Sequence, residues 1–206
     1  MRTLGSGVLP RSRRVAGEGE FAGLLDGARR RQPDALRALH DAVVRPVAAY
    51  LRTNGAVDAA GTTNEVMFRA LTNLHRFEGD EDRFRAWVLT IAHHRLVDER
   101  RSRSRRPMEV GLTGDEDRVV APDDPVATVE ASAATRAVLD AIADLPESQR
   151  TVITLRWVGG LSLAEVADIL GCQVGAVKAL QHRGVEALRT RLGRVSQHLD
   201  LTFTGS

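Results

Sequence analysis

The chain has 206 residues, of which 43% are hydrophobic and 27% charged, as in an ordinary globular protein. This composition excludes a disordered chain and a collagen, and the single cysteine, Cys172, excludes a disulfide scaffold. Because no uncharged apolar run reaches about 18 residues, we expect no membrane insertion and a cytoplasmic location. The formal net charge is +2, yet 28 of the 29 basic residues are arginine, whose planar guanidinium suits phosphate binding.

The charges are segregated along the chain. Residues 95–106 carry a net charge of +4, whereas residues 109–130 carry −6 and contain several glycines and prolines. A basic block followed by an acidic, helix-breaking block is typical of a domain edge and a linker, which we place at 107–128. The first 20 residues are rich in glycine and arginine without hydrophobic periodicity, so we predict a mobile basic tail there.

Hydrophobic periodicity predicts only helices in the first half of the chain. Apolar residues recur at steps of three and four over 33–53, with Pro33 suited to a first helical turn. Further helices are predicted at 62–75 and at 81–104, and a short one at 20–31. These helices can bury one core, and we assign residues 21–106 to a first domain.

The second half is also predicted to be helical. The spacing favours helices at 129–144, 147–158, 162–170 and 174–192, with a boundary at Leu145–Pro146. We assign 129–194 to a second domain and 195–206 to a C-terminal tail. No segment alternates with period two, so the predicted fold class is all-α: two small helical bundles joined by a flexible acidic linker, the second containing a helix-turn-helix.

The helix-turn-helix is predicted at residues 163–182. Ser162 and Glu165 have the spacing of a capping box, and Gly171 can adopt the left-handed conformation that ends a helix. We expect Cys172 and Val177 to face inward. An ordinary helical hairpin is the structural alternative. The outward positions of the second helix, which would lie in the major groove, are Gly175, Ala176, Lys178, Ala179, Gln181, His182 and Arg183.

These outward side chains suggest two kinds of DNA contact. Gln181 and His182 can address base edges, whereas Lys178 and Arg183 are suited to phosphates. A second basic surface is expected on the helix at 81–104, opposite an apolar face through Trp87. Such a helix fits along a nucleic-acid backbone, although a solvated charged face is the alternative.

Three segments resemble one known family. FRAWVLTIAHHRLVDERR (84–101) resembles a signature of the sigma-70 family, extracytoplasmic-function (ECF) subgroup, and ALRALHDAVVRPVAAYLR (35–52) resembles the helix that opens its region two. LPESQRTVITLRWVGGLSLAEVADILGCQVGAVKALQHRGVEALRTRL (145–192) resembles its region four. The likeness spans about 33–106 and 129–192 in the family's order, with only a linker between.

The resemblance implies a protein that is not an enzyme and needs no cofactor or metal. Such a protein binds core RNA polymerase, directs it to promoter DNA and helps to melt the start site. By resemblance, region four would read the minus-thirty-five element through the outward positions named above. The core polymerase would contact Asn64, Glu65, Phe68 and Arg69. The minus-ten element would contact Arg76, Phe77, Arg83, Arg85, His93, Arg95, Arg100 and Arg101.

The resemblance carries two further expectations. The loop from Phe77 to Asp82 could line a pocket for an extruded base, whose unstacking costs a few kcal/mol. Family members are often held inactive by an anti-sigma factor, which makes such a protein an expected partner.

Two positions depart from the family pattern. The polymerase-binding helix usually carries an acidic pair and Gln-Glu, whereas this chain has Ala60-Gly61-Thr62-Thr63-Asn64-Glu65. Glycine within a helix costs about 1 kcal/mol, so we predict that the helix starts near Thr62. Gln173 replaces the usual small hydroxyl residue before the recognition helix and weakens that cap.

Two other functions compete with the sigma-factor interpretation. A stand-alone helix-turn-helix regulator would use residues 163–182 only and would leave the 84–101 signature unexplained. A nucleic-acid hydrolase could be built on His93, His94 and Asp98. Adjacent histidines on a helix point about 100° apart, which makes a shared metal ion difficult.

Overall fold

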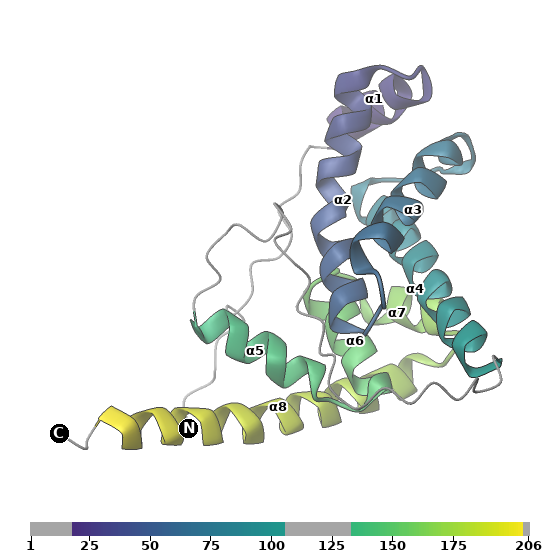
Figure 1. Ribbon diagram of the computed structural model, residues 1–206. Coiled ribbons are helices and arrows are strands. Elements are labelled where there is room, and N and C mark those ends of the chain that lie inside the picture. The colour runs from purple at the N-terminus through teal and green to yellow at the C-terminus, as the bar shows by residue number, and fades with distance from the viewer. Residues whose placement is uncertain (1–17, 106–132, 204–206) are drawn as a thin grey trace, which may run out of the picture.

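The computed structural model describes residues 18–105 and 133–203, and it places the side chains of 19–105 and 138–193. Within these ranges the regular structure is entirely helical, which confirms the predicted fold class (Figure 1). Most of the predicted basic tail and the whole predicted linker at 107–128 lie outside the described residues.

The first group of helices follows the sequence periodicity closely. Helix α2 (Pro33–Thr53) has the predicted bounds, and α4 (Glu81–Arg105) extends the predicted helix by one residue. Helix α1 (Glu18–Arg29) begins inside the segment expected to be a tail. The group is completed by α3 (Ala59–Thr72) and a 3₁₀ turn η1 (Leu74–Arg76).

The start of α3 differs from the prediction. The helix begins at Ala59 rather than near Thr62, because the Asp58 carboxylate accepts a hydrogen bond from the Gly61 backbone N–H at 2.8 Å. Such an N-cap satisfies a donor that the first helical turn leaves free. A Cβ at position 61 would lie 2.1 Å from Asp58 Oδ2. The Asp58 cap therefore offsets the cost of the glycine and lets the helix begin earlier than predicted.

The second group comprises α5 (Ala133–Ala143), α6 (Glu147–Trp157), α7 (Leu163–Leu170) and α8 (Val174–Phe203). Helix α8 continues beyond residue 192, through most of the segment expected to be a tail. It runs along the base of the molecule, where α5, α6 and α7 pack against it (Figure 1).

An aromatic cluster anchors the first group. Phe84 is fully buried on α4, and its ring centroid lies 5.9 Å from that of Phe21 and 5.4 Å from that of Phe77. Trp87 stacks on Phe77 at 5.3 Å between centroids. These contacts hold the first turns of α4 against α1 and the segment after η1.

The two groups of helices pack against each other. Val152 and Leu155 of α6 belong to the same buried apolar cluster as Leu51 of α2 and Leu89 of α4. Helix α2 contacts α6, and α4 contacts α7. A separate cluster, which includes Ile142 and other residues of α5, α6 and α8, lies wholly within the second group. The described helices therefore form one body with a shared core.

Candidate nucleic-acid interface

The predicted helix-turn-helix is confirmed in its local geometry. Ser162 Oγ accepts from the Glu165 backbone N–H at 3.2 Å, and Glu165 Oε2 accepts from the Ser162 N–H at 2.6 Å, which completes the capping box. Gly171 ends α7 in the left-handed conformation, with φ of 61°. Val177 of α8 is fully buried. The turn therefore holds the first turns of α8 in a defined position against α7.

The first turns of α8 present a solvent-facing surface. Lys178, His182 and Arg183 are exposed beside the small residues Gly175, Ala176 and Ala179. Gln181 is only half-buried, and its Oε1 accepts a hydrogen bond from Arg156 Nε at 3.2 Å. Arginine only donates, so the Gln181 amide keeps its oxygen toward Arg156 and its NH₂ group remains for other partners.

The expectation that Cys172 packs inward is wrong. Its side chain is exposed, although its backbone N–H donates to the Ala167 carbonyl at 3.0 Å. The left-handed residue Gly171 reverses the chain direction, which ties the Cys172 backbone to α7 and leaves its thiol outside. The prediction relied on the apolar character of cysteine, whereas the geometry of the turn decides which way the side chain points.

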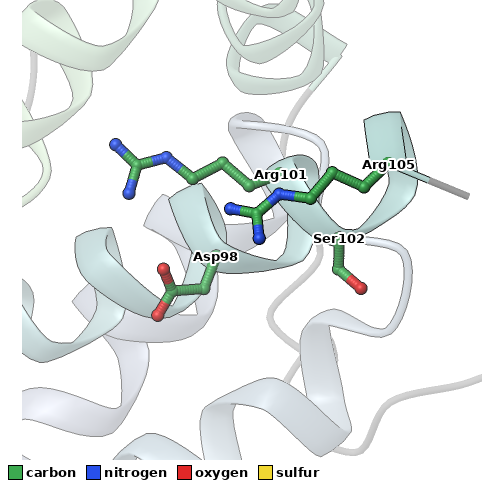
Figure 2. Close-up of a pocket in the computed structure, with 4 residues that line it drawn as sticks. All are labelled: Asp98, Arg101, Ser102 and Arg105. Carbon is green, nitrogen blue, oxygen red and sulfur yellow. The ribbon is translucent and has the colours of Figure 1, made fainter.

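The C-terminal end of α4 is an exposed basic surface. Arg101, Arg103 and Arg105 are all exposed. Figure 2 shows Arg101 and Arg105 extending toward the same side of the helix, where they line a shallow hollow with Asp98 and Ser102. Cations near a helix C-terminus are stabilised by the helix dipole, and they remain available for phosphates.

Two predicted minus-ten residues are not at the surface. Arg85 is 4% exposed, and its guanidinium donates to Glu81 at 3.1 Å and to Asp82 at 3.2 Å. Phe77 is 6% exposed within the aromatic cluster. In this structure neither side chain faces solvent: Arg85 pairs with carboxylates three and four residues earlier on its own helix, and Phe77 packs against other rings.

Three more of the predicted residues are half-buried and engaged within the chain. Arg95 Nε donates to Glu65 Oε2 at 2.6 Å, and His93 Nδ1 lies 2.8 Å from the Tyr50 hydroxyl. Arg100 donates to the Asn54 carbonyl and forms an ion pair with Glu147. Arg76 and Arg83, by contrast, are exposed.

Sequence reasoning missed Asn54, which receives one of these contacts. Asn54 is 1% exposed, its side chain donates to the Tyr50 carbonyl at 2.9 Å and it accepts from the Thr151 hydroxyl at 3.0 Å. An asparagine followed by Gly55 at a helix end is a recognisable stop signal. Nothing local in the sequence, however, indicates that its partner is Thr151, which is 97 residues away.

Helix α3 carries an unusual exposed aromatic side chain. Phe68 is 72% exposed, although Val66 and Met67 beside it are buried. Asn64 is exposed on the same helix. Glu65 accepts from Arg95 and also pairs with Arg69 at 2.7 Å. The hydrogen bond from Arg95 is the main reason that the pKa of the Glu65 carboxyl lies below its usual value, and the same bond raises the pKa of Arg95. The carboxylate therefore ties α3 to α4.

Thermal stability should depend on His93 in mildly acidic solution. Burial lowers the pKa of His93, and the neighbouring His94 and Arg100 lower it further, whereas Glu147 raises it. A lowered pKa means that the unfolded chain binds the proton more tightly, so stability should fall as the pH drops below about 6.5. His93→Gln should flatten the melting temperature between pH 7.5 and 5.5, whereas the exposed control His75→Gln should not. An equal slope in both variants would contradict this role.

The hydrolase alternative gains no support from the histidine geometry. The rings of His93 and His94 are 6.0 Å apart between centroids, and His93 contacts the Tyr50 hydroxyl. In the part of the chain that the structure describes, no three His, Cys, Asp or Glu side chains gather as metal ligands. Among the described helices, none is long and apolar enough to cross a bilayer.

Two family matches cover the two groups of helices. Residues 35–106 match the family described as Sigma-70 region 2, and residues 141–190 match Sigma-70, region 4. The first match spans α2 to the end of α4, and the second contains α6, α7 and the start of α8. The segments 35–52 and 84–101 noted in the sequence fall inside the first match, and the segment 145–192 coincides with the second match up to residue 190.

Relatives and solved structures extend the match. The ECF RNA polymerase sigma factor BldN of Streptomyces coelicolor is 34% identical over 85% of this chain and 68% of its own length. The ECF RNA polymerase sigma factor SigL of Mycobacterium tuberculosis is 31% identical over 82% of this chain and 94% of its own length. The sigma factor RpoE from Bartonella quintana, solved with the anti-sigma factor NepR, covers 75% of this chain and 94% of its own, with a TM-score of 0.61 at 21% identity. CnrH, solved with the cytosolic domain of CnrY, covers 83% of this chain and 96% of its own, with a TM-score of 0.55 at 22% identity.

The first matched region contains the exposed Phe68 and the basic end of α4, and the second contains the helix-turn-helix. The identity with BldN and SigL extends over most of this chain and over two thirds or more of each relative. The chain therefore belongs to the ECF subgroup of the sigma-70 family, and it is a sigma factor that directs promoter recognition and transcription initiation.

Proposed function

We propose that this sigma factor reads the minus-thirty-five element with α8, contacts the minus-ten region with α4 and docks on core RNA polymerase through α3. The observation that carries the proposal is the exposed face of α8 around Lys178 and His182, held by a complete capping box and turn. We further propose that the protein is a regulatory subunit without catalytic activity of its own and acts in the cytoplasm.

At the minus-thirty-five element, the charged and neutral side chains have different tasks. Lys178 and Arg183 reach phosphates and supply affinity, whereas His182 addresses a base edge. The Gln181 amide is held by Arg156 and offers its NH₂ group, which matches acceptors on a base edge. The small residues Gly175, Ala176 and Ala179 allow close approach of the backbone.

At the minus-ten region, the proposal rests on fewer residues than the sequence analysis named. The exposed guanidiniums are those of Arg76, Arg83 and Arg101. Arg101 shares its helix end with Arg103 and Arg105, so the three form a basic strip suited to a phosphate backbone. Arg95, Arg100 and His93 would contribute only after releasing their present partners.

Core RNA polymerase is proposed to bind the exposed face of α3. Phe68 offers a large apolar surface, and its neighbours Asn64, Glu65 and Arg69 add polar contacts around it. An exposed aromatic side chain with a polar rim is the usual composition of a binding hot spot. The acidic pair of the family pattern is absent, so Phe68 carries a larger share of this interface.

An anti-sigma factor is a further proposed partner. The sigma factor RpoE, which shares this fold, was solved with an anti-sigma factor, and CnrH, also of this fold, was solved with the cytosolic domain of CnrY. Co-purification of this chain with the product of a neighbouring reading frame would test the proposal. Recovery of this chain alone would count against that partner.

Run-off transcription with core RNA polymerase tests the proposed function directly. The purified chain should start specific transcripts that core polymerase alone does not make. A stand-alone helix-turn-helix regulator would give no initiation unless another sigma factor were present. Mapping the transcript starts would also identify promoter fragments for binding experiments.

Lys178→Ala should weaken binding to such a promoter fragment and reduce its salt dependence. The loss of one phosphate contact lowers the slope of log K against log salt by about 0.9. Fluorescence anisotropy between about 50 and 200 mM salt measures this slope. Lys178→Arg keeps the charge and should retain the slope. If the alanine variant lost affinity only for fragments altered at one base pair, the phosphate role would be wrong.

A further inference from the structure

The helix assigned to the minus-thirty-five element begins with an exposed valine. Val174 is the first residue of α8, and its side chain is 39% exposed. Among the side chains that the structure places, only two other large apolar ones are exposed, those of Val57 and Phe68. Val177, one turn further along α8, is fully buried. The helix thus buries one valine in the core and leaves a large part of the other open to solvent.

The turn before α8 fixes the position of Val174. Gly171 ends α7 in the left-handed conformation, and the Gln173 carbonyl accepts from the Ala176 N–H at 2.9 Å, which begins α8. Val177 then anchors the first turn of the helix in the core. Valine is branched at Cβ and strongly prefers one χ1 rotamer in a helix. The two methyl groups of Val174 are therefore held in place before DNA arrives.

The start of such a helix is the part that reaches the bases. In helix-turn-helix proteins the second helix lies in the major groove, with its N-terminal residues against base edges. Val174 is the first of these residues in α8. Lys178, which is proposed to contact a phosphate, is exposed one turn later on the same side of the helix. Val174 therefore continues the proposed DNA surface toward the base edges.

Gly175, beside Val174, has no packing reason to lack a side chain. A Cβ at this position would meet no atom within 4 Å, and the backbone does not adopt the left-handed conformation that favours glycine. Gly184 of the same helix differs, because a Cβ there would lie 2.9 Å from Ile153 Cγ1. Glycine within a helix costs about 1 kcal/mol relative to alanine. The open space at Gly175 is what the close approach of another molecule requires.

A valine at a base edge selects for an apolar group. In the major groove the base pairs present hydrogen-bond donors and acceptors, and thymine adds its C5-methyl group. A valine side chain gains free energy when it buries that methyl group, and it loses free energy when it covers a donor or acceptor that it cannot pair. Thymine is therefore the base that fits Val174.

We propose that Val174 is a specificity-determining residue that reads the C5-methyl group of a thymine in the minus-thirty-five element, with Gly175 providing the clearance for this approach. The inference rests on the proposed role of α8 at that element. It divides the work on the helix, because Lys178 supplies affinity for any sequence whereas Val174 supplies a choice between bases.

Replacement of thymine by deoxyuridine tests the contact, because it removes the methyl group and keeps the hydrogen-bonding edge. Promoter fragments carry one deoxyuridine at each thymine of the element in turn, on either strand. The full chain, assembled with core RNA polymerase, is titrated with each labelled fragment. At one position deoxyuridine should weaken binding about fourfold, the value of one buried methyl group. Val174→Ala should bind the thymine and deoxyuridine fragments equally at that position.

Three further variants control the experiment. Val57→Ala removes the same atoms from an exposed valine outside the helix-turn-helix and should keep the preference for thymine. His182→Ala should weaken binding to both fragments alike and also keep this preference. Gly175→Ala should raise the melting temperature, because alanine is the better helix former, yet weaken promoter binding. Circular dichroism confirms that each variant is folded.

An equal loss on deoxyuridine in the wild type and in Val174→Ala would overturn the inference. It would also be overturned if no thymine methyl group mattered although other base changes in the element reduced binding, or if Gly175→Ala bound the promoter undiminished. These results would leave the proposed function standing, because α8 would still read the element. If neither base changes in the element nor Lys178→Ala altered binding, the proposed role of α8 would be refuted, and the inference with it.

Discussion

Phe84→Ala is expected to lower the free energy of unfolding by about 3–5 kcal/mol, the usual cost of removing a buried aromatic ring. Phe84 is fully buried and contacts the rings of Phe21 and Phe77, so its loss leaves a cavity that rigid neighbours cannot fill. Because the free energy of unfolding of a folded protein is only about 5–15 kcal/mol, this loss is a large part of it.

Urea unfolding followed by circular dichroism measures the effect, and Phe68→Ala is the matched control. Phe68 is 72% exposed, and its removal should change stability by no more than about 0.5 kcal/mol. A similar loss in both variants would mean that the aromatic cluster does not anchor the start of α4.

Phe68→Ala should instead weaken binding to core RNA polymerase about 30-fold, which corresponds to about 2 kcal/mol and to a typical hot-spot residue. The physical reason is that the interface would lose its one large apolar anchor on α3, while Asn64, Glu65 and Arg69 form only a polar rim. Titration of labelled sigma factor with core polymerase, read by anisotropy, gives the affinity.

Val57→Ala is the control for this second experiment, because Val57 is also 72% exposed but lies outside α3. It should leave the affinity for polymerase unchanged. An undiminished affinity of the Phe68 variant, with its stability intact, would move the polymerase-binding surface away from α3.

Local patterns predicted the helices well. The apolar spacing over 33–53 gave both ends of α2, and the Ser162–Glu165 box with Gly171 gave α7 and the turn that follows. These features depend on residues within one or two turns of each other, and their physical chemistry can be read from a single segment. The same periodicity predicted which residues of α8 are exposed, and only Gln181 among them is half-buried.

The errors arose where a distant or competing partner decides the outcome. Arg85, expected on an open face, is buried against carboxylates of its own helix, and Cys172 is turned outward by the left-handed residue before it. The Asn54–Thr151 bond joins residues 97 positions apart. The periodicity of one segment contains no information on such a pairing, so the contact between the two groups of helices required the structure.

The cap at the start of α3 acts on a surface to which it does not belong. The Asp58 carboxylate accepts from the Gly61 N–H, and the helix it caps carries Phe68. A homologue with alanine at position 58 would lose this acceptor, at a cost of about 0.5–2 kcal/mol in helix stability. Drift at a position that touches no partner would thus weaken the element that docks on the polymerase.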